Sequence, residues 1–265
     1  MYNEYWGLKE SPFENVPDPR FMYHFPQHDE ALMRMMFAVK ARKGAAMLTG
    51  EVGCGKTMLS RAFIQQLAGG PYEIALIANP SFPPIDFLRE ILYQLGIKKT
   101  SESKAELSHF LNETILDNMK KGKDTIIIID EAQVINNADT YEELRLLLNF
   151  QLNERFLLTL ILIGQPELRN HIIAIPQFEQ RVAIKYHLGT LNLDETAKYI
   201  MFRLKTAGMQ KNVFTKESII KVHEYTQGVP RRINNICDLA LLVGFSSKTT
   251  VIDSKLILKL IEDRG

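Results

Sequence analysis

The sequence predicts an α/β fold with a parallel sheet between two layers of helices, followed by a small all-helical domain. Three observations predict it. Short apolar stretches alternate with amphipathic ones over the first part of the chain. Beyond Leu191 only amphipathic stretches follow. A glycine-rich loop joins the first apolar stretch to an amphipathic one, which is typical of a phosphate-binding domain.

The composition is that of an ordinary globular protein. The chain has 265 residues, 46% of them apolar, which suffices for one large α/β domain with a small domain attached. Its formal net charge of +1 creates no general attraction to nucleic acid. The two cysteines, Cys54 and Cys237, indicate a reducing compartment.

The N-terminus lacks the basic start and apolar run of a signal peptide. No stretch approaches the roughly 18 consecutive apolar residues that cross a bilayer. We therefore expect a soluble, cytoplasmic chain that reaches the inner membrane only through a partner.

Residues 1–28 are rich in proline and aromatic side chains, as in Ser11-Pro12-Phe13 and Val16–Pro19. Proline at this density excludes a long helix. The aromatic residues favour a segment that packs on the α/β core.

Residues 29–190 are expected to form that core. A helix is predicted from His28 to Lys40–Gly44, because apolar residues recur there at three- and four-residue spacing. Apolar, β-branched stretches predict strands at Ala45–Thr49, Glu73–Ala78, Thr125–Ile129, Phe156–Ile163 and Ala183–Leu188. The stretches between them predict helices at Lys56–Leu67, Ile85–Leu95, Leu107–Lys120 and Tyr141–Asn149.

Residues 191–265 are expected to form the helical domain, with the boundary near Gly189–Asn192. Its amphipathic stretches predict helices at Glu195–Thr206, Lys216–Thr226, Pro230–Phe245 and Ser254–Glu262.

The octapeptide Gly50–Thr57 has the spacing of a phosphate-binding loop, and it lies between a strand and a helix as such loops do. Glycines let the backbone curl so that several N–H groups point at the phosphates, and the following helix directs its positive dipole end at the same anion. Lys56 adds a charge toward the outer phosphates, and Thr57 supplies a hydroxyl to Mg²⁺. ATP and Mg²⁺ are the predicted ligands. The predicted nucleotide contacts are Gly50, Glu51, Val52, Gly53, Cys54, Gly55, Lys56, Thr57 and Met58.

Asp130 and Glu131 follow the buried strand at Thr125–Ile129. In phosphate-loop enzymes the first acid holds the hydrated magnesium ion, and the second activates the attacking water. By itself this pair would also fit the polar end of an ordinary core strand. Downstream of a phosphate loop it predicts Asp130 as a metal ligand and Glu131 as the general base.

Three further side chains are placed by their order along the chain. Gln165 follows the next strand and is predicted to orient the attacking water, although it would also fit a glutamine that begins a loop. Arg181 precedes the last strand of the core and is predicted to act on a neighbouring subunit's nucleotide; a surface arginine is the alternative. Arg231 opens a helix of the small domain and is predicted to sense the γ-phosphate; the alternatives are a helix-start arginine, or Arg232 in the same role.

Two other groups of residues carry little weight. The six histidines lack metal-ligand spacing, so no metal site is expected from them. The lysine-rich segments Lys98-Lys99 and Lys120–Lys123 are most simply the solvated ends of helices or strands. The alternative is that they contact DNA or an acidic partner.

With these motifs in place, the chain resembles the AAA+ ATPases, and among them the ExeA-like family of general secretion pathway protein A ATPases, related to mannose-sensitive pilus biogenesis and exopolysaccharide-export ATPases. The resembling segments are Tyr5–Phe13, Pro17–Phe21, the phosphate loop, Asp130–Gln133, Leu162–Leu168 and Gly228–Asn234. They run through essentially the whole chain.

The resemblance implies an AAA+ core with a helical lid, working as an ATP-dependent homo-oligomer, often a ring. It implies a motor or switch in the assembly of a bacterial secretion, pilus or export machine, with an envelope assembly protein as partner. Secretion members carry a transmembrane segment and a peptidoglycan-binding domain after the ATPase domain, and neither is found in these 265 residues.

Two other functions stay open at this point. The main alternative is a DNA-binding ATPase of the transposition-regulator type, because that family is related to the ExeA-like family. The net charge favours the envelope role over this alternative. A protein that binds ATP without hydrolysing it is disfavoured by Glu131.

Overall fold

A computed structural model describes residues 2–152 and 155–263 of the chain, so the predicted domain ends at residues 1 and 264–265 lie outside the described residues. The described chain forms two compact units. The α/β unit consists of residues 27–52 and 59–188, and the helical unit of the residues up to Pro26, Gly53–Met58, and those from Gly189 onward.

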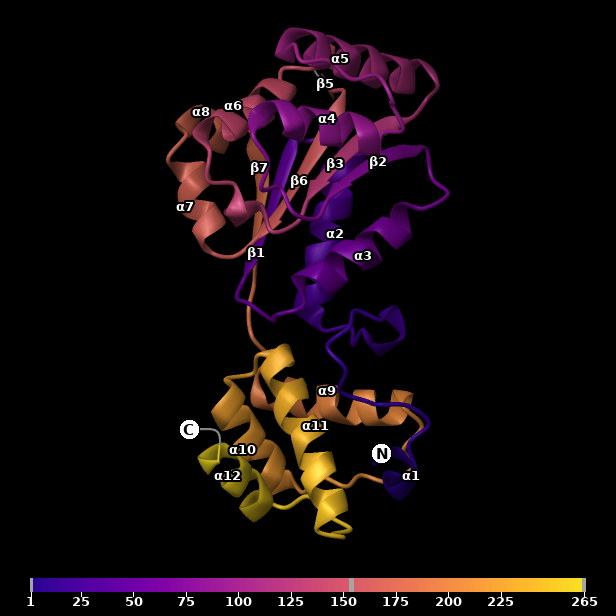
Figure 1. Cartoon of the computed structure of the whole chain (residues 1–265), viewed down its shortest axis with the longest axis vertical. Helices are drawn as coiled ribbons and strands as arrows, with labels where there is room; N and C mark the ends of the chain where they lie inside the picture. The colour runs from indigo at the N-terminus through magenta and orange to yellow at the C-terminus, as the bar shows by residue number, and fades with distance from the viewer. Residues whose placement is uncertain (1, 153–154, 264–265) are drawn as a thin grey trace. The chain divides into compact units, whose positions relative to one another are not determined.

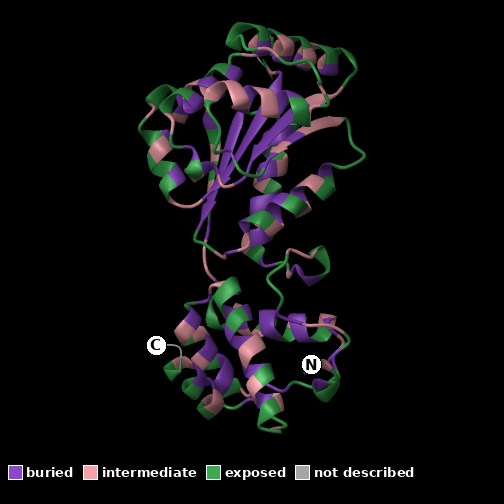
Figure 2. Ribbon diagram, in the orientation of Figure 1, coloured by how far each residue is buried: buried purple, intermediate pink, exposed green. Residues whose placement is uncertain are grey.

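The centre of the α/β unit is a five-stranded parallel sheet with the strand order β2-β3-β6-β1-β7 (Figure 1). The four residues Ile126–Ile129 are fully buried, because a β-branched strand in the middle of a parallel sheet is covered on both faces. Figure 2 shows the same burial along the inner strands. The strands are β1 (Ala45–Gly50), β2 (Tyr72–Ile77), β3 (Asp124–Ile129), β6 (Leu158–Gly164) and β7 (Val182–Leu188).

Helices form a layer on each side of this sheet. Alternate strand residues such as Ala45, Met47 and Ile127 belong to one core cluster with residues of α4, α5, α6, α7 and α8. On the other face, residues of the inner strands such as Ala46, Leu48 and Ile128 are also buried, and the remaining helices with apolar faces, α2 and α3, supply that second layer. The helices are α2 (Pro26–Lys40), α3 (Lys56–Leu67), α4 (Pro84–Gln94), α5 (Lys104–Lys120), α6 (Ala138–Leu147), α7 (Glu167–Ile173) and α8 (Pro176–Glu179).

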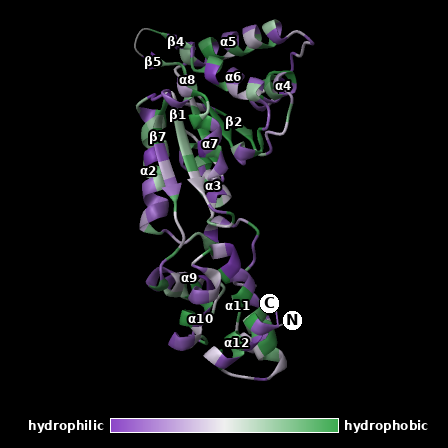
Figure 3. Cartoon of the chain, turned by 90° about the vertical axis from the view of Figure 1, so that its left-hand side faces the viewer, coloured by the Kyte–Doolittle hydropathy of each residue, from purple (hydrophilic) through white to green (hydrophobic). Residues whose placement is uncertain are grey.

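The helical unit contains the four predicted helices, and as Figure 3 shows, hydrophobic and hydrophilic stretches alternate along them. The Asn192 side chain and Glu195 form a reciprocal capping box at the start of α9. The helices are α9 (Leu193–Thr206), α10 (Lys216–Thr226), α11 (Pro230–Ser246) and α12 (Ser254–Glu262), with the short α1 (Asn3–Trp6) and a 3-10 turn, η1 (Pro19–Phe21). The predicted fold class, a parallel α/β core followed by helices, is confirmed.

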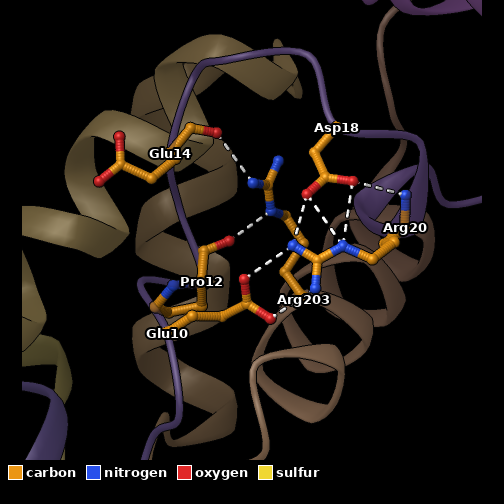
Figure 4. Close-up of polar contacts among 6 residues, drawn as sticks. All are labelled: Glu10, Pro12, Glu14, Asp18, Arg20 and Arg203. Carbon is orange, nitrogen blue, oxygen red and sulfur yellow. Dashed lines mark hydrogen bonds and ion pairs between the residues drawn. The ribbon is translucent and has the colours of Figure 1, made fainter.

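The N-terminal segment does not pack as expected from sequence. Its buried aromatic residues share one core cluster with α9–α12 rather than with the sheet. The Trp6 indole N–H donates to the Leu241 carbonyl oxygen at 2.9 Å. The Arg203 guanidinium, 5% exposed, donates to the carbonyl oxygens of Pro12 and Glu14 (Figure 4). A buried guanidinium needs several acceptors, and carbonyl groups of the N-terminal segment supply two of them, while the Tyr199 hydroxyl accepts a third bond.

Several boundaries differ from the predicted ones for local reasons. Helices α5 and α6 begin three residues early, because Ser103 and Asn137 cap them with side-chain oxygens. Strand β6 begins late, because Arg155–Phe156 (β5) pairs antiparallel with Gln151–Leu152 (β4). The short helices α7, α8 and η2 (Ala132–Val134) escaped prediction, since fewer than eight residues show no clear period. Within the described chain, no helix is both long and apolar enough to cross a membrane.

Candidate nucleotide-binding and hydrolysis site

Three adjacent strands of the sheet end in polar segments. Gly50 closes β1, Asp130 follows β3, and Gln165 follows β6, which lies between the other two. The register pairs Thr49 with Gly164, so the loops after β1 and β6 start side by side. The carboxyl ends of parallel strands form one edge, and ligands of open α/β sheets bind outside that edge.

The backbone of the phosphate loop has the conformation that its glycines permit. Gly53 and Gly55 have φ angles of +85° and +98°, which L side chains rarely adopt. Helix α3 begins at Lys56, so the positive end of its dipole lies at the end of the loop, where it favours an anion. Lys56 is 5% exposed, whereas Thr57 is exposed.

The start of the loop is fixed by close packing on β7. A Cβ atom on Gly50 would lie 2.8 Å from the Leu188 carbonyl oxygen. Any larger residue at position 50 would therefore push the loop away from the sheet. Of the other predicted contacts, Glu51 and Val52 are exposed, Met58 is half-buried, and Cys54 is buried at 1% exposure.

Asp130 and Glu131 occupy contrasting environments. Asp130 is 5% exposed, its Oδ1 accepts from the Glu131 backbone N–H at 2.9 Å, and its own N–H donates to the Ile77 carbonyl oxygen. Glu131 is half-buried and has φ +51°, a left-handed conformation that costs a non-glycine residue about 1–3 kcal/mol. Asp130 is thus buried at the end of the strand, whereas Glu131 is partly exposed in the turn that follows.

Gln133 connects the loop after β3, which carries Glu131, to the loop after β6, which carries Gln165. Its Nε2 donates to Glu131 Oε2 at 2.6 Å, and its Oε1 accepts from the Gln165 backbone N–H at 2.9 Å. A Cβ atom on Gly164 would lie 2.7 Å from Gln133 Oε1, so glycine at that position leaves room for the bridge. The Gln133 amide thus ties Glu131, the general-base candidate, to the loop after β6. No site role was predicted for Gln133; in the sequence, only its place in the segment Asp130–Gln133 pointed to it.

Tyr141 supports the turn that carries these residues. Its hydroxyl donates to the Ala132 carbonyl oxygen at 3.0 Å and lies 3.0 Å from His171 Nδ1. Burial raises the pKa of the Tyr141 phenol well above its ordinary value, which keeps the donor protonated. The hydrogen bond therefore persists at any pH near neutral.

Arg181 lies at the amino-terminal ends of the strands, whereas Glu131 and Gln165 lie at the carboxyl ends. It precedes Val182, which pairs with Ala45, the first residue of β1. The length of β1, about 20 Å for six residues, separates that edge from the carboxyl ends. Its Nη1 donates to the Leu148 carbonyl oxygen at 2.7 Å, at the end of α6. The structure does not bring Arg181 to the chain's own Glu131 and Gln165.

Arg231 lies beside the phosphate loop within the helical unit. Its backbone N–H donates to the Gly53 carbonyl oxygen at 3.2 Å, and a Cβ atom on Gly53 would lie 2.7 Å from the Arg231 Cβ. Arg232 is committed elsewhere: its Nη2 donates to the Tyr225 carbonyl oxygen, and its guanidinium lies 5.4 Å from the Tyr225 ring centroid. Of the two neighbours, Arg231 is the one placed at the loop.

The tight turn before α11 brings Arg231 to this position. Gly228 has φ +71°, and a Cβ atom on it would lie 1.9 Å from the Leu191 carbonyl oxygen. The Leu191 N–H donates to the Gly228 carbonyl oxygen at 2.9 Å. Only glycine fits this approach of the turn to the segment before α9.

Comparison with known proteins agrees with the fold. Residues 39–172, about half of the chain, match the family described as AAA domain. The chain belongs to the AAA ATPase family. Its AAA domain is that of an ATP hydrolase, and the phosphate loop lies within the matched residues.

Two kinds of relative are similar to this AAA ATPase. Over 250 residues it is 38% identical to general secretion pathway protein A of Aeromonas hydrophila, a match that covers 93% of this chain and 45% of that protein. The chain thus spans less than half the length of this relative. Its fold is similar to the ORC2 protein of Aeropyrum pernix (TM-score 0.71, 18% identity, 96% of this chain and 71% of that one). It is also similar to Cdc6p of Pyrobaculum aerophilum (TM-score 0.69, 14% identity, 91% and 67%).

The described side chains offer few ligands for a metal ion. Among the described residues, no group of three or more His, Cys, Asp or Glu side chains could hold a metal ion. Mg²⁺ in nucleotide sites is held by one or two protein oxygens together with phosphate oxygens and water. An exposed hydroxyl at Thr57 and a buried carboxylate at Asp130 are ligands of that kind.

Proposed function

We propose that the chain is a Mg²⁺-dependent AAA+ ATPase that acts as an oligomeric motor or switch in the assembly of a bacterial secretion, pilus or export machine. The observation that carries the hydrolytic part is the Gln133 bridge between Glu131 and the Gln165 backbone. A protein that only binds nucleotide has no need to position a carboxylate in a strained turn.

The chain's own residues divide the reaction as follows. The backbone N–H groups of the loop and Lys56 bind the phosphates and compensate their charge. Glu131 accepts a proton from the attacking water while the bond from the γ-phosphorus to the β,γ-bridging oxygen breaks, and ADP leaves with that oxygen. The Gln165 side chain orients the water.

Thr57 and Asp130 are the residues proposed to hold Mg²⁺. When bound, the ion neutralises negative charge on the β- and γ-phosphate oxygens. Thr57 would contact it through its hydroxyl, and Asp130 through a carboxylate that the Glu131 N–H already orients.

Arg181 and Arg231 are proposed to act from two different directions. Arg231 starts α11 beside Gly53, so its side chain can report the nucleotide to the helical unit. Arg181 lies at the wrong edge of the sheet for its own site, which favours an action on a neighbouring subunit. The bond to Leu148 uses only part of the five N–H donors of the guanidinium.

The biological process rests on the similarity to general secretion pathway protein A. Its cytoplasmic location, with attachment to the inner membrane through an envelope partner, is part of this proposal. The DNA-binding alternative has less support, because two lysines of the basic group Lys120–Lys123 pair with acids of the chain itself. Lys120 pairs with Asp117 at 3.3 Å and Lys123 with Glu73 at 2.5 Å.

Two variants test the ATPase mechanism. Glu131→Gln should bind ATP, fail to hydrolyse it, and accumulate as an oligomer in size exclusion with light scattering. Lys56→Ala should lose ATP binding and stay in the nucleotide-free state of assembly. A Glu131→Gln protein that remains monomeric with saturating ATP would argue against the oligomeric switch.

The process is tested in cells with the same trap. Tagged Glu131→Gln protein is crosslinked, and its neighbours are identified by mass spectrometry against the Lys56→Ala protein as control. Enrichment of secretin, pilin-assembly or export components supports the envelope role. Enrichment of a transposase, together with an ATPase rate that rises with double-stranded DNA and falls steeply with salt, would support the alternative.

A further inference from the structure

A groove in the helical unit lies outside every residue assigned above. It encloses about 560 Å³ between the N-terminal segment at Phe13–Pro17 and one face of α11. The α11 residues Asn235, Asp238 and Leu242 line it, and their spacing of three and four residues places them in one row along the helix. We refer to it as the strap groove, after the segment Phe13–Pro17 that forms its wall.

The wall of the strap groove is held firmly. Arg203 donates to the carbonyl oxygens of Pro12 and Glu14 from beneath, and Asn15 is fixed at its side-chain amide. The Asn15 Oδ1 accepts from Asn234, and its Nδ2 donates to Asn235. A groove built in advance loses little conformational freedom when a ligand enters it.

Five of the residues that line the groove are apolar, and two of these face solvent. Val16 is 71% exposed and Leu242 is 37% exposed; the other three are Phe13, Pro17 and Leu239. An isolated exposed side chain is ordinary, but several that line one cavity on a rigid frame form a site for apolar side chains.

The polar groups of the groove select for charge. Its nine lining residues, all within the described chain, include two carboxylates, Glu14 and Asp238, and no basic side chain. Asp238 accepts a hydrogen bond from the Tyr2 hydroxyl. The Glu14 carboxylate points away from Arg203, which contacts only its carbonyl oxygen (Figure 4). A cationic ligand therefore meets complementary charge here, and an anionic one meets repulsion.

The backbone of the wall is open to a partner chain. Within the part of the chain that the structure describes, the N–H groups of Glu14, Asn15 and Val16 donate no hydrogen bond. The wall is not a β-strand, since it has a turn at Pro12–Phe13 and a bend at Val16, but its unused N–H groups are donors that carbonyl oxygens of a partner segment can meet.

We propose that the strap groove docks an extended segment of a partner protein in which apolar side chains alternate with lysine or arginine. The apolar side chains enter between Val16, Leu239 and Leu242, and the cations lie near Glu14 and Asp238. The groove contains no residue of the hydrolysis site, so this docking does not depend on the proposed ATPase mechanism.

The test is a fluorescence-anisotropy titration of the full chain, without nucleotide, using three labelled ten-residue peptides. One alternates leucine and lysine, one alternates leucine and glutamate, and one alternates serine and lysine. We expect saturable binding of the leucine–lysine peptide alone, weakened by salt. Glu14→Lys and Leu242→Asp should each weaken it about tenfold or more, because one reverses a facing charge and the other places a charge in the apolar floor.

Matched controls exclude general effects of charge. Glu262→Lys makes the same charge change on α12, and Ile220→Asp alters an exposed apolar residue of α10 (39% exposed) outside the groove; both should bind the peptide normally. Circular dichroism melting identifies any variant that is unfolded, and Val16→Asp then replaces Leu242→Asp.

Three results would overturn the proposal. These are no binding of the leucine–lysine peptide at about 1 mM, the weak end of specific recognition, equal binding of the leucine–glutamate peptide, or binding that the groove variants leave unchanged. A change in the chain's own sedimentation with Leu242→Asp, with no peptide present, would assign the groove to a second copy of the chain instead.

Discussion

Gln133 donates a hydrogen bond from Nε2 to Glu131 Oε2 at 2.6 Å, while its Oε1 accepts from the Gln165 backbone. The two bonds fix the orientation of the amide, since only a nitrogen can face the carboxylate and only an oxygen can face an N–H. A residue that is expected to touch neither the phosphates nor the metal thus positions the base candidate. The catalytic loop after β3 and the loop after β6 are coupled through it.

Gln133→Ala should therefore lower kcat for ATP hydrolysis by roughly tenfold to a hundredfold, because Glu131 loses its orientation. The Kd for ATP and the melting temperature should change little, since neither the phosphate loop nor the core is altered. Steady-state kinetics and a fluorescent-nucleotide titration check both. Gln94→Ala on the exposed side of α4 is the control. An unchanged kcat would show that Glu131 does not need this partner.

Arg231→Ala should reduce ATP hydrolysis by about tenfold or more, because the substitution removes the cation that α11 places beside the phosphate loop. Arg232→Ala removes the same charge one residue later, from a guanidinium bound to Tyr225. It should keep most of the activity. Parallel rate measurements on the two variants decide between them, and the opposite order would transfer the role to Arg232.

Arg181→Ala should bind ATP normally and hydrolyse it very slowly, since arginine fingers are worth about a thousandfold or more in rate. Mixing it with Glu131→Gln should restore part of the activity. At some subunit boundaries an Arg181→Ala subunit, whose Glu131 is intact, then lies beside a Glu131→Gln subunit, whose Arg181 is intact. The recovered rate should rise with protein concentration.

The control for this mixture is the double variant Arg181→Ala/Glu131→Gln in place of Arg181→Ala. It co-assembles but creates no complete site, so it should restore nothing. If the first mixture also stays inactive although light scattering shows co-assembly, Arg181 serves only as the cap of α6 through Leu148.

Arg203→Ala should destabilise the helical unit by about 2–4 kcal/mol, because the bonds to Pro12 and Glu14 are lost and a buried space remains. Lys205→Ala on the same helix is exposed and should leave the stability unchanged. Urea unfolding measures the difference. Limited proteolysis should also cut Arg203→Ala first within the N-terminal segment; equal stability of both variants would show that this segment is held by its aromatic residues alone.

The elements that the sequence predicted well share one property. Three predicted helices have the observed bounds to the residue, because apolar periodicity and capping residues are local signals; they are Lys56–Leu67, Lys216–Thr226 and Ser254–Glu262. Short segments such as α7 and α8 hold too few turns for a repeat to be recognised, and their apolar residues pack in the core beside the sheet. The roles of the individual site residues stay predictions that the experiments above test.

The sequence by itself determined the phosphate loop, the acids after β3 and the alternation of strands and helices. Each depends on neighbours along the chain: glycine φ angles, a helix start, a β-branched run. Only the tertiary structure decided that β6 lies between β1 and β3, that Gln133 joins Glu131 to Gln165, and that the N-terminal aromatics pack on the C-terminal helices. Those outcomes depend on which distant surfaces bury one another and on which distant acceptors satisfy a buried Arg203, and no local pattern records such pairings.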